Sequence, residues 1–157
     1  MLNRINYLAI LIMMLILFLF SSNVYGQEDI KAKMLKFISI STDIVYGKAL
    51  FFESKYSKSG NSIFTDLTFE VNAVFKGAVK ENDRITVRLP GGTVNGLTTF
   101  AVHAPSFKLE EEAVLFLKEI KDSRSEHLGK YFIVKMSESK YNVYGAGPAE
   151  KKYVVAD

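Results

Sequence analysis

The sequence predicts a mainly β fold of five to seven antiparallel strands, a small barrel or sandwich, behind an N-terminal amphipathic helix and a cleaved signal peptide. Three observations predict it. Residues 1–26 have the layout of an export signal, residues 28–41 place apolar side chains at helical spacing, and the segments after Asp43 alternate apolar and polar side chains. We expect residues 27–157 to form one domain with its own core.

The first residues predict export. Arg4 gives a positive start, residues 8–20 form an uninterrupted apolar run, and Val24 and Gly26 occupy the small-residue positions of a cleavage site. A membrane-spanning helix needs about 20 apolar residues, and this run is shorter, so cleavage after Gly26 is favoured over a retained anchor. We therefore expect a periplasmic or secreted protein with no membrane span after cleavage.

The composition of the remaining chain narrows the possible partners. Residues 27–157 carry almost as many acidic as basic side chains, which argues against a dedicated nucleic-acid binder. The chain has no cysteine, so no disulfide framework supports the fold. The core alone must hold the domain together.

The predicted helix and first strand follow one another directly. Residues 28–41 place Ile30, Met34, Phe37 and Ile38 on one helical face. A long strand is expected from Asp43. Gly47 within that strand indicates a bend or the close approach of another backbone, as at the corner of a small barrel. The inward face of the strand is expected to carry Val45, Gly47, Ala49 and Phe51.

The second predicted strand begins at Ile63, after a turn at Gly60-Asn61. Its alternation is that of a half-buried strand. A Lys-Gly corner at Gly77 ends it, and Phe75 just before that corner is expected to pack in the core or at the barrel rim. The inward face comprises Ile63, Thr65, Leu67, Phe69 and Val71.

The second half of the chain predicts shorter strands. Residues 84–90 form the third strand, and 91–96 a loop. An irregular edge strand follows at 97–104, and the apolar run 113–120 is a central strand. A solvated loop spans 122–129, a terminal hairpin pairs 131–136 with 141–145, and a last short strand lies near the C-terminus.

Four short motifs resemble a known family: TDIVYGKA at 42–49, FEVNAVFKG at 69–77, ITVRLPGG at 85–92 and EEAVLFL at 111–117. In this order they resemble the netrin-like domain, the five-stranded OB-type barrel of the tissue inhibitors of metalloproteinases, and exported bacterial proteins with the same pattern. The resemblance implies an OB-like barrel that serves as a binding scaffold. The inhibitors reach the zinc of their target through an N-terminal cysteine, whereas Gln27 stands here, so their inhibitory residues are not carried over.

No catalytic, cofactor or metal site is expected. The two histidines, His103 and His127, lie far apart without ligand spacing, and no GxSxG motif is present. The run at 110–112 is interpreted as a solvated turn before a buried strand. Asp66 and Glu70 share the polar face of the second strand, roughly 13 Å apart, which is too far for a retaining glycosidase pair.

The glycine-rich stretch GGTVNG is interpreted as a connection and not as a phosphate loop, because a strand and no helix follows it. Loops beside one mouth of an OB-type barrel carry ligands, so this stretch is the best candidate contact surface. With the expected new N-terminus, the candidate residues are Gln27, Gly91, Gly92, Thr93, Asn95 and Gly96.

These inferences favour an exported, non-enzymatic binding module without a cofactor. Its partner would be a protein or peptide outside the cytoplasm, proteases included, and not a nucleic acid. The alternatives are a small cell-envelope hydrolase, with a site assembled from scattered polar residues, and a structural envelope component. Polar residues converging in a pocket would favour the hydrolase, and exposed apolar loops at one barrel mouth would favour the binding module.

Overall fold

The computed structural model describes residues 29–144 and 153–156. The expected signal peptide, residues 1–26, and Gln27 lie outside the described residues. The chain divides into two compact units, Met1–Ser39 and Ile40–Asp157. Residues 29–40 are helical, close to the predicted range 28–41. No helix within the described ranges has the length and apolar character needed to cross a membrane.

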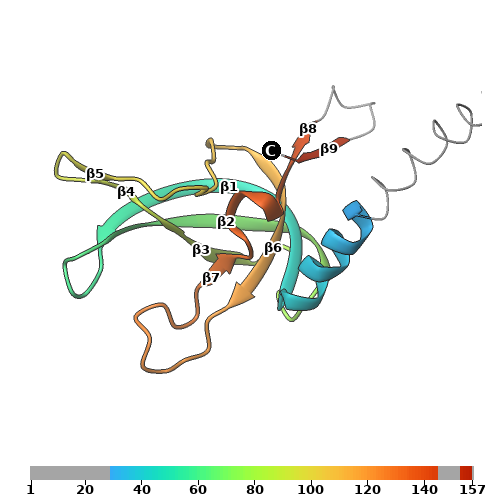
Figure 1. The fold of residues 1–157 in the computed structure, drawn as a ribbon, viewed down its shortest axis with the longest axis horizontal. Helices are drawn as coiled ribbons and strands as arrows, with labels where there is room; N and C mark the ends of the chain where they lie inside the picture. The colour runs from blue at the N-terminus through green and yellow to red at the C-terminus, as the bar shows by residue number, and fades with distance from the viewer. Residues whose placement is uncertain (1–28, 145–152, 157) are drawn as a thin grey trace, which may run out of the picture. The chain divides into compact units, whose positions relative to one another are not determined.

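The second unit is built from strands, in agreement with the prediction of a mainly β fold (Figure 1). One short 3₁₀ helix, η1, interrupts them. The elements are β1 (Asp43–Tyr56), β2 (Ile63–Lys76), β3 (Arg84–Pro90), β4 (Gly92–Val94), β5 (Leu97–Thr99), β6 (Glu112–Glu119), β7 (Tyr131–Ile133), η1 (Met136–Ser139), β8 (Lys140–Tyr144) and β9 (Tyr153–Ala156).

Five of these strands close into a barrel. The sheet order β1-β2-β3-β7-β6 returns to its start through a pairing of β1 with β6. The prediction that all strands are antiparallel is wrong, because β3 and β7 run parallel, with Val87 opposite Tyr131. A parallel pair requires a crossover between its strands, and here the whole segment from β4 to β6 supplies it. The result is a mixed barrel compatible with the OB type.

The expected terminal hairpin is also absent. β7 and β8 do not pair with each other, and both pair with β6 instead. β7 lies along Leu117–Glu119 and β8 along Ala113–Leu115, on consecutive stretches of the same strand. The predicted last strand is confirmed as β9, which pairs with β8. The continuous apolar run of β6 fits its central place among β1, β7 and β8.

Gly47 lies where β1 turns, as predicted. The β1–β2 register shifts between Tyr46 and Gly47, and a Cβ added at Gly47 would lie 2.0 Å from the carbonyl oxygen of Glu70. The backbone of β2 therefore passes too close for any side chain at this position. Pairing of β1 with β6 extends only from Asp43 to Lys48.

The prediction that Phe51 points inward is wrong. A further register shift falls between Ala49 and Phe51, and it inserts one extra residue into β1. Because side chains alternate with period two, this bulge reverses the faces of the residues beyond it. Phe51 is 58% exposed, and Phe52 packs against the core in its place.

The core is formed by the inward faces of the barrel strands. Four of the five predicted inward residues of β2 are buried and Thr65 is half-buried; Leu67, Phe69 and Val71 are completely buried. Phe75, expected in the core or at the rim, is 65% exposed, while Val74 packs against the core.

The corner that follows β2 is fixed by Asp43. Its Oδ1 accepts hydrogen bonds from the backbone N–H groups of Ala78 and Val79 at 2.9 and 3.4 Å. Gly77 has φ +115, and a Cβ there would fall 2.0 Å from the same carboxylate oxygen. The Lys-Gly corner is thus a structural requirement of the turn.

Candidate functional site

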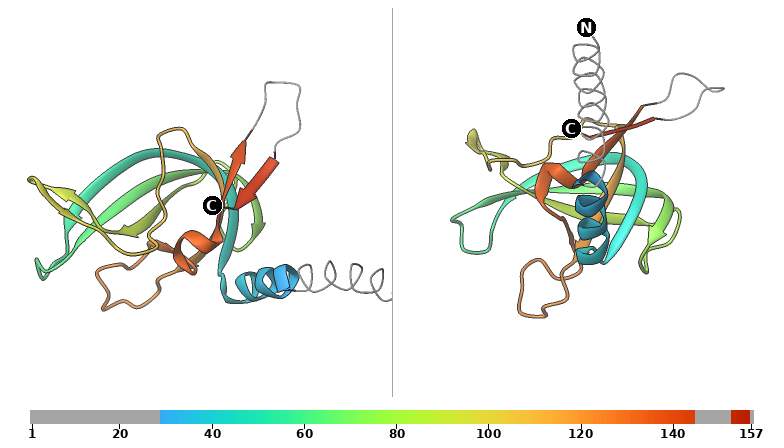
Figure 2. Two further views of the ribbon diagram at one scale, coloured as in Figure 1. Left: turned by 45° about the horizontal axis from the view of Figure 1, so that its top comes forward. Right: turned by 45° about the vertical axis from the view of Figure 1, so that its right-hand side comes forward.

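The predicted loop at 91–96 contains strand β4, which forms a two-stranded ribbon with β5, and β5 is the start of the edge strand predicted at 97–104. β4 and β5 pair antiparallel, with Val94 opposite Leu97. Asn95 and Gly96 connect them with φ of 50 and 81, the left-handed pair that a two-residue type I′ hairpin requires. The Asn-Gly dipeptide between Val94 and Leu97 is the signal that could have predicted it. In all three ribbon views the hairpin projects from the barrel body (Figures 1 and 2).

The two glycines at the base of the hairpin bring it close to β1 and β2. Gly92 has φ +136, and a Cβ there would lie 2.3 Å from Thr65 Oγ1 and 2.5 Å from Ser54 Oγ. Thr65 donates a hydrogen bond to the carbonyl of Gly91 at 2.8 Å. Gly91 and Gly92 therefore position the hairpin, and the contact surface must come from the side chains beyond them.

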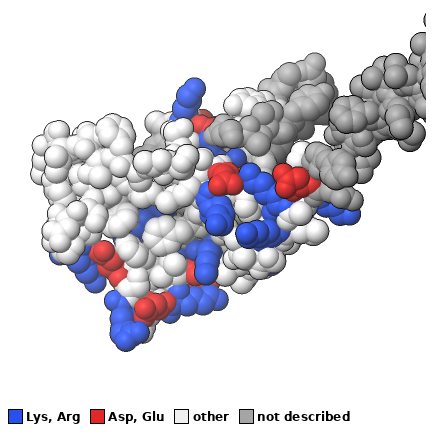
Figure 3. Space-filling view, viewed as in Figure 1, with Lys and Arg blue, Asp and Glu red and all other residues white. Residues whose placement is uncertain are grey.

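Those side chains are uncharged and exposed. Residues 89–107 contain no Asp, Glu, Lys or Arg. Within them Leu97, Phe100 and Val102 are 57%, 89% and 81% exposed. Figure 3 shows the corresponding region, at the upper left, without charged side chains. We call the exposed part of residues 93–103 the hairpin surface.

A cavity of about 370 Å³ lies beneath the hairpin. Its walls combine aromatic and aliphatic side chains with threonine hydroxyls, and they include Phe52, Leu89, Thr98, Phe100 and Phe107. Of the six predicted contact residues, the structure brings Gly91, Gly92 and Thr93 to this cavity, while Asn95 and Gly96 form the hairpin tip.

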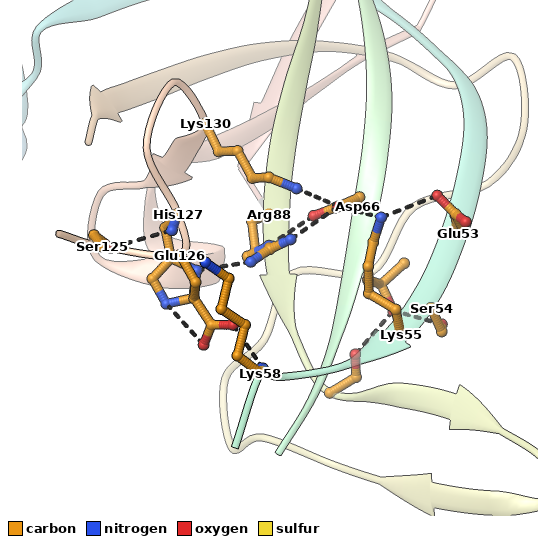
Figure 4. A network of polar contacts seen from close by, with 12 residues as sticks. Glu53, Ser54, Lys55, Lys58, Asp66, Arg88, Ser125, Glu126, His127 and Lys130 are labelled. Carbon is orange, nitrogen blue, oxygen red and sulfur yellow. Dashed lines mark hydrogen bonds and ion pairs between the residues drawn. The ribbon is translucent and has the colours of Figure 1, made fainter. Parts of the chain in front are cut away.

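A second candidate site, which is polar and which the sequence did not reveal, lies on the outer face of β2 and β3 (Figure 4). Arg88 donates from Nε and Nη2 to the two carboxylate oxygens of Asp66 at 2.7 and 3.0 Å. Lys55 Nζ lies 3.0 Å from Asp66 Oδ2, and Lys130 donates to the same oxygen. We call these four residues, together with His127, the Asp66 cluster.

The ion pair at the centre of the cluster is buried although it lies outside the barrel. Asp66 and Arg88 are 6% and 5% exposed. Burial by itself would raise the pKa of Asp66, but hydrogen bonds from Arg88, Lys130 and Lys55 outweigh burial and hold that pKa well below its ordinary value. Asp66 is therefore ionised at neutral pH, where it pairs with three cations.

His127 connects the cluster to the loop between β6 and β7. Arg88 Nη1 lies 2.7 Å from His127 Nδ1. Because a guanidinium only donates, Nδ1 must accept, which places the imidazole proton on Nε2. The ring meets Phe64 and Phe132 edge-on at centroid distances of 5.1 and 5.3 Å. The prediction of a solvated loop holds for most of 122–129, which is exposed, but His127 is half-buried and packs against the sheet.

A further contact joins this loop to the β1–β2 turn. The backbone N–H of Lys58 donates to Glu126 Oε2 at 2.8 Å. Every charged member of the cluster has a partner of opposite charge or a hydrogen bond, and His127 supplies no free base. The arrangement is that of a clamp that holds two loops on the outer face of the barrel.

The acidic run at 110–112 is paired as well. Glu110 forms an ion pair with Lys48, and Glu112 accepts a hydrogen bond from Tyr46, each at 2.6 Å. Glu111 pairs at 2.6 Å with Lys140, whose side chain is 1% exposed and lies over the Phe107 ring. In the described ranges no three His, Cys, Asp or Glu side chains gather in a way that could hold a metal.

Glu110 carries a backbone conformation that normally belongs to glycine, with φ of 63. We expect Glu110→Gly to have a higher free energy of unfolding than Glu110→Ala by about 1 kcal/mol, because only alanine retains the left-handed strain. Both variants lose the ion pair with Lys48, so the comparison isolates the backbone. Urea denaturation of the two variants measures the difference, and a more stable alanine variant would contradict the assignment.

These features define the class of the protein as a closed, mixed five-stranded β-barrel with an uncharged hairpin at one end and a buried ionic clamp on one face. Comparisons of the chain with known protein families, with curated proteins and with solved structures returned no match.

Proposed function

We propose that this protein is an exported, non-enzymatic binding module that engages a protein or peptide through its hairpin surface. The observation that carries the proposal is the exposure of Leu97, Phe100 and Val102 within a stretch without charge. Exposed apolar side chains gathered in one place mark interaction sites. Depletion of charge and a central aromatic side chain are typical of the energetically dominant part of an interface.

The fold supports the same proposal. A closed barrel compatible with the OB type, together with the four sequence motifs, is the basis for proposing a netrin-like relationship. Gln27 in place of the inhibitors' cysteine leaves zinc coordination without a ligand from that position, so a partner is better sought at the hairpin. The Asp66 cluster and the acidic run consist of mutually paired charges, and no observation on the described residues favours the hydrolase or the structural envelope component.

The test begins with a photo-reactive amino acid at position 100 in the exported protein and a second version with the same group at Lys121, which is exposed on the β6–β7 loop. We expect a defined adduct with one envelope or secreted protein from position 100 and none from 121. The captured protein is then purified, and its affinity for the binding module is measured directly.

The matched variant is Leu97→Ser, Phe100→Ser, Val102→Ser, and its control is Lys121→Ser with Arg124→Ser. Loss of a dominant apolar contact costs about 2 kcal/mol or more, so the triple variant should bind roughly 30-fold more weakly. The thermal midpoint should stay unchanged, because all three side chains are exposed. Equal affinity of the two variants would exclude the hairpin surface as the binding site.

A further inference from the structure

A second apolar site lies around β7 and η1. One cavity of about 290 Å³ is lined by Leu89, Pro90, Pro105, Phe132, Ile133 and Met136, with Arg88 and Lys135 as its only charged residues. A second cavity of about 370 Å³ shares Phe132, Ile133 and Lys135 and adds Lys118. We call the two together the β7 groove.

The charge of the β7 groove has one sign. Neither cavity is lined by an aspartate or a glutamate. Arg88 is already bound to Asp66, but for Lys118 and Lys135 no side-chain ion pair is found within the described ranges. An anion placed at Lys135 would therefore lie beside two cavities whose linings carry cations and no carboxylate.

The backbone at the groove is held in an uncommon conformation. Lys135 and Met136 are consecutive and both left-handed, with φ of 58 and 57. Such a conformation is unfavourable for residues with a Cβ, and strain of this kind gathers at functional positions. It is held by a hydrogen bond from the Ser137 backbone N–H to the carbonyl of His103 at 3.1 Å and by one from Ser139 Oγ to the carbonyl of Val134.

The geometry points to a binding site for a small aliphatic carboxylate, with its chain in the apolar cavity and its carboxylate at Lys135. The volume lies at the lower end of the range for ligand cavities, about 300–1,000 Å³, which suits a small molecule. An apolar lining with a few polar groups at the edge is the common pattern of such sites. The site uses none of the three apolar side chains of the hairpin surface and stands independently of the function proposed for it.

The test compares three ligands of equal chain length and different charge: octanoate, octanol and octylammonium, each titrated calorimetrically into the purified protein. We expect octanoate to bind at least tenfold more tightly than octylammonium, with octanol between them. Lys135→Glu should reverse the order of the two charged ligands. Lys121→Glu, which changes the same charge on the β6–β7 loop outside both cavities, should leave the order unchanged.

Met136→Gly separates binding from folding. Glycine relieves the backbone strain at φ 57, which offsets the loss of the Met136 side chain, so the thermal midpoint should stay unchanged. The Met136 side chain is part of the cavity wall, so octanoate affinity should fall at least threefold. Equal binding of octanoate and octylammonium, an order unaffected by Lys135→Glu, or no octanoate binding at millimolar concentration would each overturn the proposal.

Discussion

Asp66→Asn should lower the free energy of unfolding by about 3–5 kcal/mol, the usual cost of removing one partner from a buried ion pair. The substitution leaves the Arg88 guanidinium, 5% exposed, without its anion, and it replaces the carboxylate that Lys55 and Lys130 share with a neutral amide. Asparagine has nearly the same shape, so the loss reports charge and not volume. Guanidinium chloride denaturation at neutral pH measures it.

The matched control is Glu70→Gln. Glu70 lies on the same face of β2, and it faces Arg84 on β3 as Asp66 faces Arg88. The Arg84 side chain is 66% exposed, so this surface pair should contribute at most about 1 kcal/mol. Similar losses in the two variants would show that burial does not set the strength of the Asp66 cluster.

Wild type and Asp66→Asn should also differ in how their free energy of unfolding responds to acid. Burial would raise the pKa of Asp66, but Arg88, Lys130 and Lys55 together hold that pKa below its ordinary value. An ionised Asp66 therefore adds stability that is complete above the unfolded pKa of about 3.9 and is lost as the pH falls further. The stability gap between wild type and Asp66→Asn should be constant near neutrality and shrink below about pH 4. A gap that widens in acid would contradict the assignment.

Gly47→Ala should lower the free energy of unfolding by about 3 kcal/mol, at the upper end of the effects of overpacking. The added Cβ would lie 2.0 Å from the Glu70 carbonyl oxygen and 2.7 Å from the Phe69 ring. One neighbour is backbone and the other is completely buried, so neither can move aside cheaply. Thermal and urea denaturation give the loss.

Gly60→Ala is the control for this variant. Gly60 has φ +76, and no atom lies within 4 Å of the place that an alanine methyl group would take. Alanine there costs only the left-handed strain, about 1–2 kcal/mol. The Gly47 variant should be the less stable of the two. Should they be equally stable, the close approach of β2 to Gly47 would not constrain the barrel.

Several parts of the fold follow from local pattern alone. The alternation from Ile63 to Val71 identifies which face of β2 is buried, because side chains on a strand change sides at every residue. The apolar run of β6 indicates a strand covered on both sides, and Gly47 in mid-strand indicates a close backbone. The Asn95-Gly96 dipeptide indicates the hairpin equally clearly, although the glycines around it favour a loop.

Other parts were decided by contacts between residues distant in the sequence. A bulge before Phe51 reverses the alternation of β1, and nothing in ALFFE marks which residue is the extra one. The choice of β6 as the partner of both β7 and β8 depends on how the barrel closes, which a pattern within each strand does not encode.

The sequence by itself determined that this protein is mainly β, which faces of its strands are apolar, and that residues 89–107 are uncharged, because these properties depend on residue type and a period of two. Only the tertiary structure decided that Asp66, on the polar face of its strand, is buried. The burial of Asp66 depends on residues that the fold brings next to it, and one of them, Lys130, lies 64 positions further along the chain. A pattern within one strand does not encode such a contact.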